Sequence, residues 1–248
     1  MSLVVFIISI VMIVIGVALA FLMPKPKNDE GATNESLLDS IKAMGVAFKC
    51  PTTYLLAGMI FCGSMTLAST TYFAPYLQNV CELPVTIGVM FSNYSKIICQ
   101  LIAASLAALL ATKLKRSSKP MIWAGFIGVI CFVIMTMLPA STVVMWPMLV
   151  IMVIALMIIY VFRALYYAVV DEAGTPKNIV GSVIGIASLL GFLPDTFFTT
   201  LCGKWIEMDP VGGYKKIFIS CICAVVLGLV CAIISDKKIV KHRASIEK

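Results

Sequence analysis

Residues 174–198 read GTPKNIVGSVIGIASLLGFLPDTFF, a run that is apolar enough to cross a bilayer. Within it, Asp195 directly follows Pro194. Small residues recur three and four positions apart, at Gly181, Gly185, Ala187, Ser188 and Gly191. This spacing places small side chains where another helix can approach closely. A proline frees backbone groups inside a spanning helix, and an acid at membrane depth is a candidate functional residue.

The composition of the whole chain is that of an integral membrane protein. Hydrophobic residues make up 61% of the 248 residues, 12% are charged, and the mean hydropathy is +1.04. Soluble domains are nearer half apolar and about one quarter charged, so a water-soluble core does not explain the excess. The net charge of +7 is therefore attributed to basic loops on one side of a membrane and not to nucleic-acid binding.

The cysteines and the single histidine predict no catalytic or metal chemistry. Most of the nine cysteines lie inside apolar runs, without the spacing of a disulfide framework or a metal site. Cys221 and Cys223 are two residues apart and so point to different faces of a helix. His242 lies in the charged tail, and no phosphate-binding glycine loop occurs. We expect no catalytic residues, no cofactor and no metal, and the chain is not expected to be an enzyme.

Seven segments have the roughly 20 apolar residues that a spanning helix needs. They are 3–23, 52–79, 85–112, 120–138, 143–169, 179–202 and 217–235. The predicted fold class is therefore an all-α membrane protein with seven transmembrane helices. The predicted organisation is a first helix over 1–23, a loop with a short amphipathic helix over 24–50, a six-helix bundle over 51–236 and a basic tail over 237–248.

The distribution of Lys and Arg predicts which ends of the helices face the cytoplasm. The connections 80–84 and 139–142 contain no Lys or Arg, whereas the alternate connections and the tail are basic. The connection predicted over 203–216 is mixed. Because Lys and Arg collect on the cytoplasmic side, the C-terminus is expected inside and, with seven spans, the N-terminus outside.

An outside N-terminus without a preceding domain has two explanations. One is a signal peptide that ends near Ala18-Leu19-Ala20. The long apolar run, the lack of a leading positive charge and the lysines that follow argue against it. The other is that the chain is the later part of something longer.

Polarity divides the segments into two groups. The first, fourth and seventh are almost purely aliphatic and are expected at the periphery, facing lipid. The others carry polar groups that must turn towards one another or towards water. Asn93, Lys96 and Gln100 share one helix face because they are three and four residues apart, and Tyr160 and Arg163 share another.

This order of peripheral and central helices resembles the C-terminal half of the major facilitator superfamily. The motif Gly181-x-x-x-Gly185-x-x-Ser188-x-x-Gly191-x-x-Pro194-Asp195 resembles the eleventh helix of a group of bacterial members, many of unassigned substrate. Arg163-Ala-Leu-Tyr-Tyr-Ala before Gly174-x-Pro176 fits the same group, and the resemblance covers nearly the whole chain. The superfamily's loop motif is present only as the basic remnant Lys113-Leu-Lys-Arg-Ser-Ser-Lys119, without its Gly and Asp.

The resemblance implies the function of a secondary active transporter. The first segment would correspond to helix six and 52–235 to helices seven to twelve, so the rest of the N-terminal six-helix half is missing and would come from the same or a separate chain. Two bundles would rock about a midplane site, giving alternating access. The implied partners are a small-molecule solute and the lipid bilayer, with no nucleic acid. The implied location is the cell (inner) membrane, multi-pass, with a cytoplasmic C-terminus.

The first candidate solute-binding residue, Lys96, lies near the bilayer midplane. At about 1.5 Å per residue, Lys96 reaches that depth, and with Asn93 and Gln100 it is expected to bind an anionic or hydrogen-bonding solute. The alternative is a structural pair with a carboxylate of a neighbouring helix. Tyrosines are further candidates for solute binding, namely Tyr72, Tyr76 and Tyr160.

The candidate coupling and gating residues are charged. Asp195 is expected to accept a coupling proton, to pair with Lys96, or to cap the backbone broken by Pro194. Arg163, near the inner boundary, is expected to pair with an acid that follows it, Asp171 or Glu172, in an ion pair that can act as a gate. More buried cations than acids favour an anionic solute such as an organic or sugar acid.

Three other classes of protein remain open on the sequence. A seven-helix receptor fits the number of spans, but neither an Asp-Arg-Tyr-like triplet nor Asn-Pro-x-x-Tyr occurs. An enzyme embedded in the membrane would need paired acids or a nucleophile with its base at one depth. A regulatory half-transporter would pair with a separate N-terminal chain and transport nothing itself.

Overall fold

The computed structural model describes residues 14–15, 37–139 and 141–246. The chain divides into two compact units, Met1–Ser40 and Ile41–Lys248. Within the described residues, six helical spans are long and apolar enough to cross a membrane, which confirms the predicted all-α membrane fold. The first predicted span, 3–23, lies almost entirely outside the described residues, so a seventh span stays a prediction.

Each predicted span from the second to the seventh corresponds to a helix or to a series of helices. The amphipathic helix predicted before them is α2 (Leu37–Lys49). The second predicted span consists of α3 (Pro51–Ser69), η1 (Thr70–Tyr72) and α4 (Phe73–Asn79). The third consists of α5 (Val85–Met90), η2 (Phe91–Ser95) and α6 (Lys96–Leu114). The next two are α7 (Ser118–Met137), then η3 (Thr142–Val144) and α8 (Met145–Leu165), with α9 (Ala168–Glu172) after them. The last two are α10 (Lys177–Gly191) with α11 (Leu193–Met208), and α12 (Pro210–Ile246).

The connection predicted over 203–216 is wrong, because α11 and α12 meet in a single turn at Asp209. The Asp209 carboxylate accepts a hydrogen bond from the backbone N–H of Gly212 at 2.9 Å. Pro210 occupies the first helical position, where its missing N–H costs nothing. An Asp cap followed by proline is a strong helix start, and it outweighs the polarity that suggested a loop.

The predicted basic tail over 237–248 is likewise not a separate segment. Helix α12 continues through Ile246 and carries most of the tail's basic residues on it. One of them is tied back to the bundle, since Lys238 Nζ donates to Thr52 Oγ1 at 3.0 Å. The cations of this end are therefore held on a helix.

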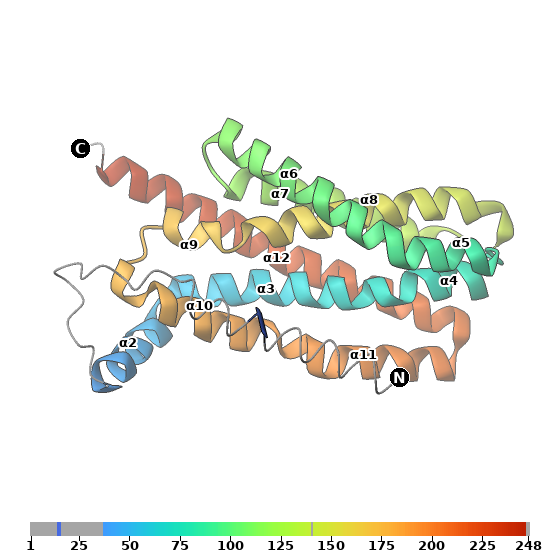
Figure 1. The fold of residues 1–248 in the computed structure, drawn as a ribbon, viewed down its shortest axis with the longest axis horizontal. Helices are drawn as coiled ribbons and strands as arrows, with labels where there is room; N and C mark the ends of the chain where they lie inside the picture. The colour runs from blue at the N-terminus through green and yellow to red at the C-terminus, as the bar shows by residue number, and fades with distance from the viewer. Residues whose placement is uncertain (1–13, 16–36, 140, 247–248) are drawn as a thin grey trace. The chain divides into compact units, whose positions relative to one another are not determined.

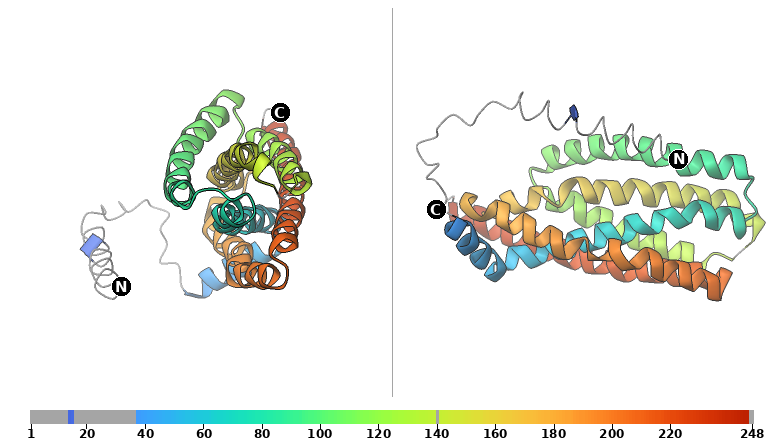
Figure 2. Two further views of the ribbon diagram at one scale, coloured as in Figure 1. Left: turned by 90° about the vertical axis from the view of Figure 1, so that its right-hand side faces the viewer. Right: turned by 60° about the horizontal axis from the view of Figure 1, so that its bottom comes forward.

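Burial within the bundle does not follow the predicted division into aliphatic and polar spans. Helix α3 contacts α12, α10 and α11 (Figure 1), and α12 packs against α3 and α7. The most buried span is that of α3–α4, one of the predicted polar spans, at 61%, and the aliphatic spans of α7 and α12 follow at 44% each. The other three polar spans are less buried, down to 17% for the one that contains α6, which lies at the edge of the bundle beside α8 (Figure 2). The polar groups of α3, such as Ser64 and Thr66, are buried inside the bundle, whereas Gln100 of α6 and Asp195 of α11 are exposed.

One side of the small-residue motif makes a close helix contact and the other side is open. A Cβ added at Gly191 would lie 2.5 Å from Ile60 Cβ and 3.1 Å from the Ala57 carbonyl oxygen of α3. Ser64 Oγ donates to the Gly191 carbonyl at 2.8 Å. At Gly181 and Gly185, by contrast, an added Cβ would meet no described atom within 4 Å. The predicted close approach is therefore confirmed at Gly191.

Candidate functional site

Three of the described spans are interrupted, and proline explains two of the interruptions. A proline clashes with the carbonyl four residues earlier and gives it no hydrogen bond. Pro75 does this to Thr71, and the helix tightens to the 3₁₀ turn η1 at that point. Pro194 does it to Leu190, and α10 ends before Phe192, which joins it to α11.

The third interruption has no proline. Residues Phe91–Ser95 form a π-helical turn between α5 and α6. The hydroxyl of Ser95 donates to the Phe91 carbonyl within this turn, which gives that carbonyl a partner. Lys96 is the next residue and the first of α6. Short π-helical turns occur frequently at functional sites.

The three interruptions surround one open cavity of about 420 Å³. The residues that line it come from the end of α3, η1, the start of α6, α8 and α11. They are Leu67, Ala68, Thr70, Thr71, Lys96, Tyr160, Asp195 and Thr199. Irregular backbone is tolerated at membrane depth where it lines a cavity, and discontinuous helices hold the solute in several transporter folds.

The cavity brings together three of the predicted site residues. Lys96 and Asp195 both line it, yet they form no ion pair within the described part of the chain. Asp195 lies in the first turn of α11, where the helix dipole favours a negative charge. Tyr160 is 9% exposed and lines the same cavity. Asn93 and Gln100 are exposed and do not line it.

The other two candidate tyrosines have different surroundings. Tyr72 donates its hydroxyl to the backbone carbonyl of Thr199 at 2.7 Å, which joins η1 to α11 at the edge of the cavity. Tyr76 is 3% exposed and packs edge-to-face on Tyr214 and Phe218, with ring centroids 5.1 and 5.3 Å away. Tyr76 is thus a core residue in this structure.

The predicted gate pair is not present in the structure. Among the described residues, Arg163 forms no ion pair with Asp171 or Glu172. Glu172 instead accepts hydrogen bonds from Ser117, from the backbone N–H at 2.9 and 3.0 Å and from Oγ at 2.7 Å. Ser117 is the N-cap residue of α7, so Glu172 satisfies a backbone donor at the start of that helix. Asp171 is exposed.

Replacing Glu172 by glutamine is therefore expected to destabilise the start of α7. The variant loses a charged acceptor for Ser117, which should lower the free energy of unfolding by about 1 kcal/mol. Thermal unfolding in detergent measures the effect. Asp171→Asn is the matched control, since Asp171 is exposed on the same short helix; an equal shift in both variants would contradict the capping role.

The sequence did not reveal a second contact at the same end of the bundle. Arg116 Nη1 lies 3.8 Å from Asp236 Oδ1, and Ser118 Oγ donates to the same oxygen at 2.6 Å. These bonds join the start of α7 to α12. The consecutive serines at the start of α7 were a signal for a helix cap, but nothing near them in the sequence identifies their acidic partners.

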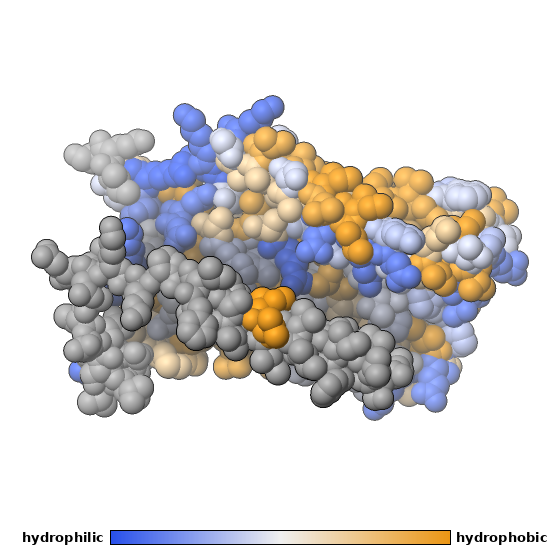
Figure 3. Space-filling view, in the orientation of Figure 1, coloured by the Kyte–Doolittle hydropathy of each residue, from blue (hydrophilic) through white to orange (hydrophobic). Residues whose placement is uncertain are grey.

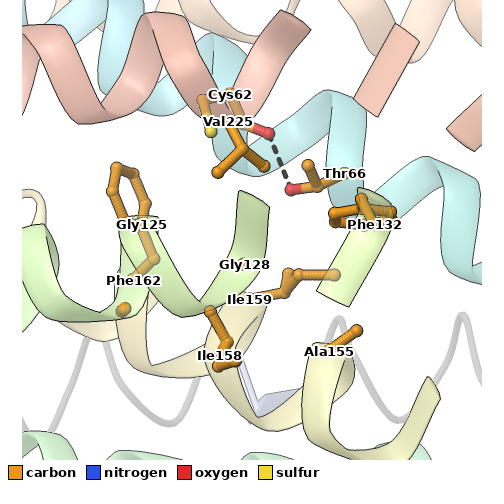
Figure 4. Close-up of a pocket in the computed structure, with 11 residues that line it drawn as sticks. Cys62, Thr66, Gly125, Gly128, Phe132, Ala155, Ile158, Ile159, Phe162 and Val225 are labelled. Atoms are coloured by element: carbon orange, nitrogen blue, oxygen red, sulfur yellow. Dashed lines mark hydrogen bonds between the residues drawn. The ribbon is translucent and has the colours of Figure 1, made fainter. Parts of the chain in front are cut away.

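A second cavity, inside the bundle, is too small for a solute. It lies among α3, α7, α8 and α12, and its lining side chains are almost all apolar (Figure 4). The Thr66 hydroxyl donates a hydrogen bond to the Cys62 carbonyl at 2.7 Å. The volume of about 20 Å³ is that of one water, and an apolar void of this kind stays dry. We regard it as a packing defect.

Comparison with known proteins identifies the family. Inner membrane protein YihN of Escherichia coli (strain K12) is 24% identical over 248 residues, which cover 95% of this chain and 57% of that protein. Inner membrane protein YqcE of the same organism is 25% identical over 240 residues, which cover 92% of this chain and 54% of that protein. The chain thus spans about half the length of these curated relatives. No solved structure matches it.

The family model described as Major Facilitator Superfamily matches residues 2–199. Together with the six described spans, this match makes the chain a multi-pass membrane protein. Its family generally contains transporters and not enzymes, which disfavours the receptor and enzyme alternatives. The chain belongs to the major facilitator superfamily.

Proposed function

We propose that the chain is the later part of a secondary transporter that carries a small organic anion by alternating access. The observation that carries this proposal is the cavity at the three helix interruptions, where Lys96, Tyr160 and Asp195 line one space. Its volume of about 420 Å³ lies in the usual range for small-molecule sites. A cation beside hydroxyl donors is a suitable site for a carboxylate that also carries hydroxyl groups.

A separate hollow on the surface of α11 also favours an anionic solute. It is lined by Thr196, Thr200 and Lys204 of α11 together with two apolar residues, and its volume is about 340 Å³. These residues follow Asp195 and Thr199 along the helix at helical spacing, so hydroxyl groups continue from the cavity towards the far end of α11. Lys204 would attract an anion to this route.

The structure leaves room for a second bundle that would complete the site. The polar faces of α6 and α11 are exposed, and no described atom lies within 4 Å of a Cβ added at Gly181 or Gly185. The chain also spans about half the length of its relatives. In our proposal a six-helix N-terminal half, from the same or a separate chain, packs there, and the positively charged helix ends and the C-terminus face the cytoplasm. The relatives' names support location in an inner membrane.

Uptake by the protein that contains this chain, reconstituted in liposomes, tests the proposal. The panel holds labelled monocarboxylates, dicarboxylates and sugar acids, each with its neutral analogue. We expect at least one acid to accumulate above protein-free liposomes, while its neutral analogue does not. Uptake of the neutral compounds alone would overturn the anion assignment. Binding of an acid without uptake would favour the regulatory half-transporter.

Proton coupling in our proposal depends on Asp195, which is exposed beside Lys96 in the cavity. Asp195→Asn cannot bind and release a proton there, so a pH gradient should no longer drive accumulation, while solute exchange across the membrane continues. Comparison of gradient-driven uptake with exchange measures this. Exposed Asp171 on α9 supplies the control variant Asp171→Asn. Gradient-driven accumulation that survives in Asp195→Asn would assign coupling to another group.

A further inference from the structure

Another hollow lies on the outside of the bundle, between α6, α7 and α8, and is almost wholly apolar. Its volume is about 150 Å³. Leu106, Leu110 and Leu114 of α6 form one wall at four-residue spacing, and Trp123 and Ile127 of α7 form the other. From Leu106 to Leu114 this groove runs about 12 Å along the helix, close to the roughly 15 Å thickness of one hydrocarbon leaflet.

One end of this groove meets a group of lysines without acidic partners. Lys113, Lys115 and Lys119 flank the end of α6 and the start of α7, and all three are exposed. Within the described residues none of them forms an ion pair. The nearby carboxylates are engaged elsewhere, Glu172 by Ser117 and Asp236 by Arg116 and Ser118. Figure 3 shows hydrophilic residues around the α6–α7 connection, beside a mostly hydrophobic surface.

Trp123 marks the depth at which the two surfaces join. It is 61% exposed and lies about 8 Å along α7 from Ser118. Exposed tryptophans of membrane proteins gather at headgroup level. The lysines would therefore lie at the height of lipid phosphates and the leucine wall at the height of acyl chains.

We propose that this groove binds an anionic phospholipid, with one acyl chain along the α6 leucines and the headgroup phosphate among Lys113, Lys115 and Lys119. Apolar area holds the chain, and each lysine near an anionic lipid surface adds attraction. The site differs from the solute cavity, because Lys113 lies about 25 Å along the helix from Lys96. The proposal does not depend on transport.

Trp123 supplies the test, because the other two tryptophans, Trp146 and Trp205, lie near the opposite helix ends. The chain with Trp146→Phe and Trp205→Phe is placed in phosphatidylcholine bilayers that contain a fixed fraction of brominated lipid, which quenches nearby tryptophan. We expect brominated phosphatidylglycerol to bind at least about threefold more strongly than brominated phosphatidylcholine, and salt to reduce this preference.

Two sets of variants separate a site from general surface charge. Lys113→Gln, Lys115→Gln and Lys119→Gln together should bring the preference to about one. Lys49→Gln, Lys177→Gln and Lys241→Gln remove the same charge from α2, α10 and α12, which do not line the groove, and should leave the preference unchanged. Leu110→Phe, which fills the groove, should weaken phosphatidylglycerol binding; Leu109→Phe, at a neighbouring position that does not line it, should not.

Several outcomes would overturn the proposal. Equal quenching by the two lipids in the unaltered chain would remove the headgroup preference. If the preference for phosphatidylglycerol falls equally in both sets of lysine variants, general surface charge explains the preference. An unchanged preference in Leu110→Phe would remove the acyl chain from the groove. Absence of quenching by either lipid would mean that protein covers Trp123, either the N-terminal half that we propose or a second copy of this chain.

Discussion

Lys96→Gln should raise the KM for the transported anion by about 10- to 100-fold, the range expected for losing a hydrogen bond to a charged group. Among the residues that line the cavity, Lys96 supplies the positive charge. It is half-buried at the end of the π-helical turn, so an anion that reaches it has shed much of its water. Initial rates of uptake into liposomes, measured over a range of solute concentrations, give the KM.

The control for this prediction is Lys216→Gln, which removes the same charge from an exposed position in the first turns of α12. Its KM should be unchanged. Lys96→Arg keeps the charge and should retain part of the affinity. Thermal unfolding of each variant shows whether the fold is intact. A normal KM in a stable Lys96→Gln protein would show that Lys96 has a structural role and that the solute binds elsewhere in the protein.

The spans could be predicted from the sequence because their signal is local. Length and hydrophobicity alone define a spanning helix, and the six described spans follow the predicted segments. Two of the three interruptions had a local signal as well, since Pro75 and Pro194 each deprive a carbonyl of its partner. The π-helical turn at Phe91–Ser95 had none, because its sequence is equally compatible with an α-helix.

Side-chain partners were harder to predict because they depend on how the helices pack. Lys96 and Asp195 were placed by estimated depth and Tyr160 by its helix face, and the structure brings all three to one cavity. Tyr76 was a candidate as a polar group of the second span, but it faces the aromatic core. Glu172 follows Arg163 closely in the sequence, yet it bonds to Ser117, 55 residues away in the sequence. Helical spacing predicts which residues share a face, but not what that face meets.

The most sensitive contact between helices is expected at Gly191. Gly191→Ala should lower the free energy of unfolding by about 1–3 kcal/mol, as overpacking does in a closely packed core. The added methyl would lie 2.5 Å from Ile60 Cβ, a branched position that cannot rotate away, and 3.1 Å from the Ala57 carbonyl oxygen. Relief requires α10 to move from α3, which would weaken the hydrogen bond from Ser64 to the Gly191 carbonyl.

For the chain measured by itself, Gly185→Ala is the matched control, and it should change stability in the opposite direction. It adds the same methyl to the same helix, but no described atom lies within 4 Å of the new Cβ. Alanine is the better helix former, so the control should gain about 0.5–1 kcal/mol. A thiol-reactive dye reports unfolding of both variants, since Cys62, Cys202 and Cys221 are buried free thiols. If both substitutions raise the unfolding temperature, α3 and α10 are not in close contact at Gly191, and the cavity between α3 and α11 loses the packing that fixes its width.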